Sequence, residues 1–483
     1  MSDIDNLKKM LRPKSERSDR GDDEHFDTRQ EDQIVDPPTT LAEVVSLQTK
    51  NLELSGEEVA LARFSNHFVS VEGGNTFVYR ETLDTETGRF DLQRMAIKAF
   101  HDLYATERVT TSRGEKAATQ VWFKSPKRRT YEGGLKLIPA QDAPAGVYNL
   151  WQGFGCTPDI TEVVPDARPA LWHLEHVICD GDHEAYQYLL RWLAHAVQHP
   201  EKQAEVAVVM IGGRGTGKGT LGGWFMELFG HHGLPIQSPD HLTGKFNSHL
   251  RGAVALFVDE AFFVGDRQGN DKLKSLITED HILVEAKYCE AAPIRNRLKI
   301  MMATNADHAI PAGTDERRFF VTRVSDRVKQ DHAYFAGLKS WWHGGGNAAL
   351  LTFLLRIDLS DFNIRKVPRT RALDEQKLAS LSGLDGWLYE LLQGDEDSWD
   401  RQRINTAATF ATRFSLYCEQ KGGRYRYVNT SPDAVGKGLR RWLGVERRRE
   451  TTKDRKWVLV LPELPEARRQ FAEKLNVRID WDV

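Results

Sequence analysis

A glycine-rich loop that follows a short apolar strand constrains this chain more than any other segment. Residues 206–221 read VAVVMIGGRGTGKGTL, so that an apolar run breaks into a loop closing with Gly217 and Lys218. Such a loop turns backbone N–H groups toward a polyphosphate, and its lysine adds positive charge near the terminal phosphates. The segment predicts a nucleotide-binding site made of Gly212, Gly213, Arg214, Gly215, Thr216, Gly217, Lys218, Gly219 and Thr220.

One position departs from the commonest form of this loop. Position 219, where a serine or threonine usually ligates Mg²⁺, is a glycine, and Thr220 follows it. The spelling GGxGxGKGT also resembles the phosphate loop of adenylate kinase, where the threonine would contact the α-phosphate. Such kinases carry the loop at their N-terminus and need an arginine-rich lid, whereas the loop here begins at residue 212. A nucleoside monophosphate kinase is therefore the weaker interpretation, and the direct Mg²⁺ ligand stays open.

Polar side chains follow two further apolar strands, at 253–258 and 298–304. Asp259 and Glu260 come directly after the first strand, and Asn305 follows the second. Acids at the carboxyl edge of a buried parallel sheet can hold a metal ion and activate water. We expect Asp259, with Thr220, to bind Mg²⁺, Glu260 to polarise the attacking water, and Asn305 to orient that water or touch the γ-phosphate of ATP. Each feature alone has an ordinary interpretation as a cap or a turn, but their order favours catalysis.

The succession of these motifs resembles a known family. GGRGTGKGT, ALFVDEAFF, IMMATN and DERRFF occur in the order found in the superfamily 3 helicase core of phage, plasmid and viral primase-helicases, and the likeness extends over roughly 145–380. The resemblance implies an AAA+ P-loop NTPase domain, assembled as a ring that is usually hexameric, with ATP bound between subunits. It also implies that Arg317 or Arg318 reaches the γ-phosphate of a neighbouring subunit and completes the catalytic set of Lys218, Asp259, Glu260 and Asn305.

A basic segment, VEAKYCEAAPIRNRLK, lies between the two acid- and asparagine-ended strands. It predicts a hairpin with its tip near 288–292, and the matching segment of the family grips single-stranded DNA in the ring channel. Lys287, Tyr288, Arg295 and Arg297 are the candidate contacts, since such binding is electrostatic and an aromatic side chain can stack on a base. The alternative is a solvent-exposed hairpin with ordinary charges.

The C-terminal part carries a second candidate surface for nucleic acid. Two predicted helices, the second with Ser431 as N-cap and Pro432 at its first position, precede two strands around a turn, which is the order of a winged helix. Residues 437–456 contain nine Lys or Arg against three acids, whereas the whole chain has a net charge of -3. We expect DNA contacts from Lys437, Arg440, Arg441, Arg447 and Arg448, and the alternative is a basic hairpin at a protein interface.

The overall prediction is an α/β protein, in which an AAA+ P-loop NTPase core lies between an N-terminal α/β domain and a C-terminal winged-helix-like domain. The chain has 483 residues, no long apolar run and four cysteines without CxxC spacing. These features indicate several domains in a reducing cytoplasm, with no membrane contact and no disulfide framework. The predicted parts are a disordered charged tail (1–40), an N-terminal α/β domain (41–175), a helical connector (176–203), the ATPase domain (204–345), a helical segment (346–398) and the winged-helix-like domain (399–483).

These features together predict a ring-forming, ATP-dependent replicative DNA helicase of a phage or other mobile element. Its cofactors would be ATP and Mg²⁺, and its partners single-stranded and forked DNA and a separate primase, in the cytoplasm of a bacterial host. The alternative is a DNA-binding P-loop NTPase that acts as an initiator, loader or defence switch without unwinding DNA.

Overall fold

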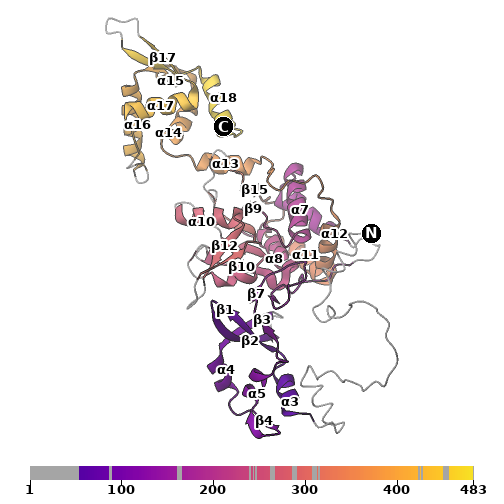
Figure 1. Cartoon of the computed structure of the whole chain (residues 1–483). Helices are drawn as coiled ribbons and strands as arrows, with labels where there is room; N and C mark the ends of the chain where they lie inside the picture. Colours follow the sequence, from indigo (N-terminus) through magenta and orange to yellow (C-terminus); the bar gives the residue numbers. More distant parts are fainter. Residues whose placement is uncertain are drawn as a thin grey trace.

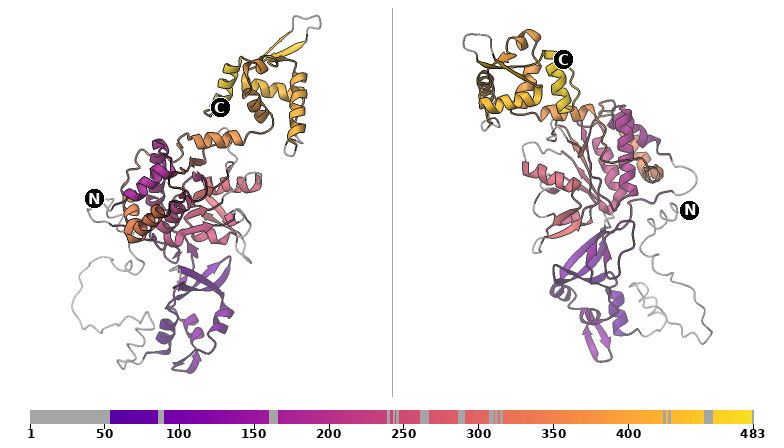
Figure 2. Two further views of the ribbon diagram at one scale, coloured as in Figure 1. Left: turned by 180° about the vertical axis from the view of Figure 1, so that it is seen from behind. Right: turned by 45° about the horizontal axis from the view of Figure 1, so that its top comes forward.

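Three parts follow one another along the molecule in the computed structural model (Figures 1 and 2). The predicted tail at 1–40 lies outside the described residues. The structure describes residues 54–85, 90–159, 166–238, 241–242, 244, 247–260, 267–285, 291–306, 310, 313, 316–422, 425, 428–449 and 456–481. None of the helices within these ranges is both long and apolar enough to cross a membrane.

The N-terminal part is a four-stranded sheet with helices packed beside it. Strands β1, β2 and β3 pair antiparallel, and short β6 joins β1 to give the order β3-β2-β1-β6. Phe64, Phe100 and Trp122 form the centre of its core. Its elements are α3 (Gly56–Arg63), β1 (His67–Glu72), β2 (Asn75–Leu83), β3 (Phe90–Ala96), α4 (Ile97–Leu103), β4 (Arg108–Thr111), β5 (Gly114–Ala117), α5 (Ala118–Lys124), β6 (Thr130–Tyr131), β7 (Leu135–Lys136) and β8 (Tyr148–Asn149).

The central part is a five-stranded, wholly parallel sheet in the order β10-β11-β14-β9-β15. The glycine-rich loop thus leaves β9, a strand with neighbours on both sides. The elements are α6 (Arg168–Trp172), η2 (His173–Ile178), α7 (His183–Gln198), β9 (Ala207–Ile211), α8 (Lys218–Phe229), η3 (Gly230–His232), β10 (Gly233–Ile236), η4 (Ser248–Gly252), β11 (Ala255–Val258), α10 (Arg267–Thr278), β12 (His281–Val284), β13 (Ala292–Arg295), β14 (Lys299–Thr304), β15 (Phe319–Arg323), α11 (His332–Trp341), η5 (Trp342–Gly346) and α12 (Asn347–Arg356).

Both faces of the central sheet are covered, which explains why its strands are apolar without alternation. Along β9, Val208 and Met210 join the core formed with α7, α8 and α12, whereas Val209 and Ile211 join the core on the α10 side. Parallel sheets are stable only when helices cover both faces, because neither face can be left to water. The predicted connector helix lies within this core: α7 begins at His183, and the side chain of Asp182 caps it by accepting from Ala185 N.

The C-terminal part has its own core, which begins at Trp387 and therefore before the expected boundary at 399. The expected helical segment 346–398 divides between two cores, since α12 packs on the central part and α14 on the C-terminal part. Ser431 caps α17 as predicted, and β17 and β18 form the expected hairpin, with short β16 beside β18. Helix α13 (Arg371–Ala379) precedes this part and places Ala372 and Leu373 in the core of the central part. The elements of the C-terminal part are α14 (Leu384–Leu392), α15 (Glu396–Asp400), β16 (Ile404–Asn405), α16 (Ala407–Lys421), α17 (Pro432–Leu443), β17 (Glu446–Arg449), β18 (Trp457–Val460) and α18 (Leu464–Leu475).

Candidate functional site

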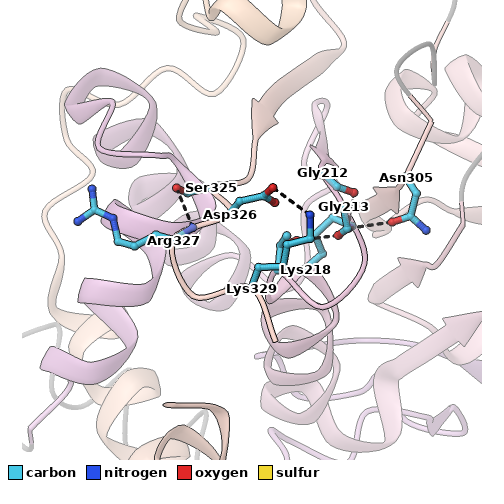
Figure 3. Close-up of polar contacts among 9 residues, drawn as sticks. Gly212, Gly213, Lys218, Asn305, Ser325, Asp326, Arg327 and Lys329 are labelled. Atoms are coloured by element: carbon cyan, nitrogen blue, oxygen red, sulfur yellow. Dashed lines mark hydrogen bonds and ion pairs between the residues drawn. The ribbon is translucent and has the colours of Figure 1, made fainter. Parts of the chain in front are cut away.

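The glycine-rich loop joins β9 to α8 at the carboxyl edge of the central sheet. Lys218, the first residue of α8, is 7% exposed, and its ammonium donates to the carbonyl oxygens of Gly212 (2.7 Å) and Gly213 (2.6 Å). The same ammonium donates to Asn305 Oδ1 at 3.0 Å (Figure 3). Burial lowers the pKa of Lys218, and the carboxylate of Asp259 opposes that shift. The structure therefore brings Lys218, Asn305 and Asp259 together, as the sequence predicted.

The buried side chain of His173 contacts the loop at Gly217. His173 Nε2 lies 3.3 Å from Gly217 O, and His173 Nδ1 lies 2.9 Å from the hydroxyl of Tyr334. Burial lowers the pKa of His173 to about 4, so the ring is neutral near pH 7. A neutral imidazole has one donor and one acceptor nitrogen, which match the Gly217 carbonyl and the Tyr334 hydroxyl. Gly217 has φ of 106°, and a Cβ atom there would lie 2.6 Å from the His173 ring, so glycine is required.

His173 and Tyr334 contribute to the surroundings of the loop, and no sequence motif marked either of them. His173 lies in η2 before the loop, and Tyr334 lies in α11 after the sheet. A single histidine without a partner at short spacing is most often an ordinary core residue. These two side chains meet the loop only in the folded chain, so local sequence patterns could not identify them.

The two predicted acids lie at the end of β11, on the same edge of the sheet as the loop. Asp259 Oδ1 accepts a hydrogen bond from Glu260 N at 3.1 Å. Glu260 has φ of 58°, which is uncommon for a residue with a side chain, and its carboxylate is 3.9 Å from Arg214 of the loop. Both side chains of this ion pair are largely exposed, at 72% for Glu260 and 85% for Arg214. The acids are thus accessible beside the loop.

The donor set is compatible with Mg²⁺. Among the described residues, no group of three His, Cys, Asp or Glu side chains could hold a metal ion. Mg²⁺ usually keeps several waters and needs only one or two carboxylates together with substrate phosphates. Asp259 can supply such a carboxylate, and Thr220 in the first turn of α8 can supply a hydroxyl, whereas Gly219 has no ligand to offer.

Arg317 and Arg318 lie away from this edge. They precede β15, whose first residue Phe319 pairs with Ala207 at the start of β9, so they occupy the opposite edge of the parallel sheet. The guanidinium of Arg318 is 3.7 Å from the nearly buried carboxylate of Glu316. Within one chain the two arginines therefore cannot reach a phosphate held by the loop.

The predicted hairpin between the two motif strands is present. Strands β12 and β13 pair antiparallel, with Val284 opposite Ala292, so Ala292, which was expected at the tip, belongs to a strand. Lys287 and Tyr288 lie outside the described residues. Arg295 is exposed and Arg297 is half-buried, and both line a hollow shared with the Gly133–Gly134 turn of the N-terminal part.

The five predicted basic residues of the C-terminal part are all exposed. Two elements carry them: α17 carries Lys437, Arg440 and Arg441, and β17 carries Arg447 and Arg448. Lys437 pairs with Asp433 at 2.8 Å, one helical turn away.

An unexpected aromatic side chain lies on the same hairpin. Trp457 of β18 is 49% exposed, and the guanidinium carbon of Arg447 lies 4.5 Å from the centre of its ring. No sequence motif marks this tryptophan.

Comparisons with known proteins relate the chain to a phage replication protein. A family model described as a family of unknown function, DUF5906, matches residues 210–318, which include the loop and the acids. The DNA primase-polymerase of Nitratiruptor phage NrS-1 is 23% identical over 167 residues; the alignment covers 34% of this chain and 22% of that protein.

Solved structures of the NrS-1 C-terminal region resemble nearly the whole chain. One apo structure aligns with a TM-score of 0.54 and 14% identity, over 87% of this chain and 98% of its own. Another, of the A form, aligns with a TM-score of 0.54 and 14% identity, over 88% and 99%. The chain shares the fold of that region.

These findings correct the predicted identity and function. The family model and the named relative point to DUF5906 and a DNA primase-polymerase, so the prediction of a superfamily 3 replicative helicase was wrong. The motifs misled because a phosphate loop, an acid-ended strand and a polar residue after the next strand serve nucleotide binding in many proteins. The hexameric ring and the trans role of Arg317 and Arg318 rested on that resemblance alone and lose their support. Phage origin and DNA replication fit the relative.

Proposed function

We propose that this chain is part of a phage DNA primase-polymerase-like replication protein, in which it binds a nucleoside triphosphate at the loop after β9. The observation that carries the proposal is the position of the Lys218 ammonium, held by two loop carbonyls and Asn305 at the edge where Asp259 ends β11. Such an ammonium is ready to exchange carbonyl oxygens for phosphate oxygens. The DNA primase-polymerase relative supports DNA as the partner.

ATP and Mg²⁺ are the proposed ligands of this site. Loop N–H groups and Lys218 would bind the phosphates, and Asp259 with Thr220 would hold the metal ion and its waters. Bound Mg²⁺ would neutralise phosphate charge and polarise the terminal phosphorus. Glu260, exposed beside Arg214, is the candidate base for an attacking water, and Asn305 would orient it. The assignment of the central part to the AAA+ class and of the C-terminal part to the winged-helix class stays a prediction.

The C-terminal basic surface is the proposed DNA contact. Its five cationic residues are exposed on α17 and β17, and Trp457 adds an exposed ring on which a base could stack. Phosphate contacts of this kind position a protein on DNA without reading its sequence.

Titration of the purified chain with ATP and Mg²⁺ in a calorimeter tests the proposal. Wild type should bind, and Lys218→Ala should weaken binding by roughly 10-fold or more, since a hydrogen bond to a charged group contributes ~1.5–3 kcal/mol. Lys339→Ala, an exposed lysine on α11, is the matched control. Equal ATP affinity of Lys218→Ala and wild type would refute the nucleotide site.

Primer synthesis and extension assays on single-stranded DNA, run with the same proteins, ask where the nucleotide is used. If nucleotide binding supports replication, Lys218→Ala should reduce DNA synthesis by a polymerising centre supplied with this chain. Unchanged DNA synthesis by a Lys218→Ala protein that no longer binds ATP would separate the site from replication.

A further inference from the structure

A second lysine lies at the phosphate loop, in a segment that no sequence motif marked. Residues 325–330 follow β15 and lie against the loop at Gly213 and Gly215. At the start of the segment, Ser325 N donates a hydrogen bond to Val177 O of η2 (2.8 Å). At its end, Gln330 N donates to Gly215 O of the loop (3.0 Å). The segment is therefore tied to the loop by its backbone.

Lys329 points from this segment toward the loop. A Cβ atom placed on Gly213 would lie 3.1 Å from Lys329 Nζ and 3.6 Å from Asp326 Oδ1, so both charged groups reach the loop backbone. Lys329 Nζ is 2.9 Å from Asp326 Oδ2 (Figure 3). Both charges act on the Lys218 ammonium: Asp326 raises its pKa and Lys329 lowers it.

The second ammonium occupies the same end of the loop as the first. Lys218 donates to the carbonyl of Gly213, and Lys329 approaches the α-carbon side of that glycine. In loops of this type the invariant lysine reaches the β- and γ-phosphates. Lys329 is thus placed for the terminal phosphates and not for the ribose or base.

The ion pair with Asp326 is weak enough to exchange. Its side chains are 42% exposed for Lys329 and 64% for Asp326, and exposed pairs of this kind contribute only about 0–1 kcal/mol. A triphosphate carries more negative charge than one carboxylate and offers several acceptor oxygens. Without Lys329, the Asp326 carboxylate would repel an anion bound at the loop.

We infer that Lys329 is a second phosphate-binding residue, which leaves Asp326 to bind the terminal phosphates of a nucleoside triphosphate beside Lys218. The inference rests on the proposed nucleotide site and deepens it by predicting selectivity for phosphate number. Lys329 should favour triphosphate over monophosphate, because only the longer chain of phosphates extends to Gly213.

The test compares ATP and AMP binding to Lys329→Ala, Lys329→Arg and wild type by calorimetry with Mg²⁺. Lys329→Ala should bind ATP about 10-fold more weakly, the effect of one charge-assisted hydrogen bond, and AMP as tightly as wild type. Lys329→Arg should recover most of the ATP affinity because it keeps the charge. Arg327→Ala is the matched control, since Arg327 belongs to the same segment and points away from the loop (Figure 3).

The outcomes separate this inference from the nucleotide site itself. If wild type binds ATP and Lys329→Ala binds it equally well, Lys329 is a surface residue and the inference fails while the site stands. Equal weakening of ATP and AMP, or equal weakening in Arg327→Ala, also overturns it, because it would indicate a general disturbance of the segment. If wild type binds no ATP, the proposed site and this inference fall together.

Discussion

At the scale of single residues, Gly219 is the position where the loop departs from its common form. The space around this residue would accommodate a side chain. A Cβ atom on Gly219 would meet no atom within 4 Å, and its backbone does not require the left-handed region. Gly217, two residues earlier, is the reverse case, since both its backbone and the His173 ring exclude a side chain.

Gly219→Ser should therefore fold normally and strengthen Mg²⁺-dependent ATP binding. The new hydroxyl would occupy the position where related loops ligate the metal ion. The measurement is ATP affinity with Mg²⁺ and with EDTA, and we expect a several-fold gain only with Mg²⁺. Gly217→Ser, the matched variant, should bind poorly in both conditions. A loss of affinity in Gly219→Ser would show that glycine is needed at 219 for another reason.

The second prediction for single residues concerns the contact of His173 with the loop and with Tyr334. Tyr334→Phe removes the hydroxyl that orients the imidazole and should weaken ATP binding by a few-fold. His173→Phe should weaken it further because the Gly217 carbonyl loses its contact with the imidazole. Thermal melting of both variants, recorded beside the ATP titrations, distinguishes a disturbed loop from a disturbed core. Unchanged ATP affinity in folded His173→Phe would contradict a supporting role for this histidine.

At the scale of elements, the hairpin of β17 and β18 combines charge with an exposed ring. Arg447 and Arg449 lie on the face of Trp457, at 4.5 and 5.6 Å from the ring centre to the guanidinium carbon. These cation–π contacts hold the arginines beside a ring that is 49% exposed, so both kinds of side chain are accessible to a ligand. The element is suited to single-stranded DNA, where phosphates and unstacked bases are both accessible.

Two substitutions on this hairpin should have different signatures. Arg447→Ala with Arg448→Ala should lower DNA affinity and reduce the slope of log affinity against log salt by about 2, one per phosphate contact. Trp457→Ala should lower affinity for single-stranded DNA with little change in that slope. Fluorescence anisotropy of labelled DNA at several salt concentrations measures both, with Lys366→Ala as the control for an exposed lysine elsewhere. An unchanged salt slope in the double variant would exclude this hairpin from the DNA interface.

At the scale of the whole molecule, the three parts meet through polar contacts between their side chains and backbone. Glu72 of the N-terminal sheet pairs with Arg251 of η4, and Phe90 N donates to His231 Nδ1 at 2.8 Å. His232 of the central part accepts a hydrogen bond from Gln152 N at 2.8 Å and stacks on Trp151. Lys377 of α13 donates to Asn476 O in the C-terminal part at 3.1 Å.

Buried histidines should make stability depend on pH. Burial lowers the pKa of His67, His173 and His232 from 6.5 to about 4, and that of His195 to about 3. The unfolded chain therefore binds more protons than the native chain below about pH 6.5, and stability should fall as the pH drops from 6.5 toward 4. The effect should fade as the pH rises above 6.5, because these histidines then become neutral in the unfolded chain as well.

Urea unfolding at pH 7.5 and pH 5.0, followed by tryptophan fluorescence, measures this dependence. We expect a lower midpoint at pH 5.0, and a smaller difference in His67→Gln, which removes one buried titrating ring beside Trp122. His183→Gln replaces an exposed histidine and should leave the difference unchanged. Equal wild-type midpoints at the two pH values would contradict the prediction.

The sequence by itself determined the local structure of this protein and the residues of one edge. The strands near the loop, the cap Ser431, and the meeting of Lys218, Asp259 and Asn305 followed from residue patterns and from the rule that parallel strands end at one edge. These features depend on neighbours in the chain or on one simple rule of sheet topology.

Only the tertiary structure decided what lies around that edge. It placed His173, Tyr334 and Lys329 against the loop from segments distant in the chain, placed Arg317 at the opposite edge, and divided the helices of 346–398 between two cores. The physical reason is that the local sequence of an amphipathic helix or of a single charged residue does not specify which distant segment it will contact. The same limit explains why the predicted family was wrong: motif order predicts a phosphate-binding edge, whereas the protein class depends on the whole fold.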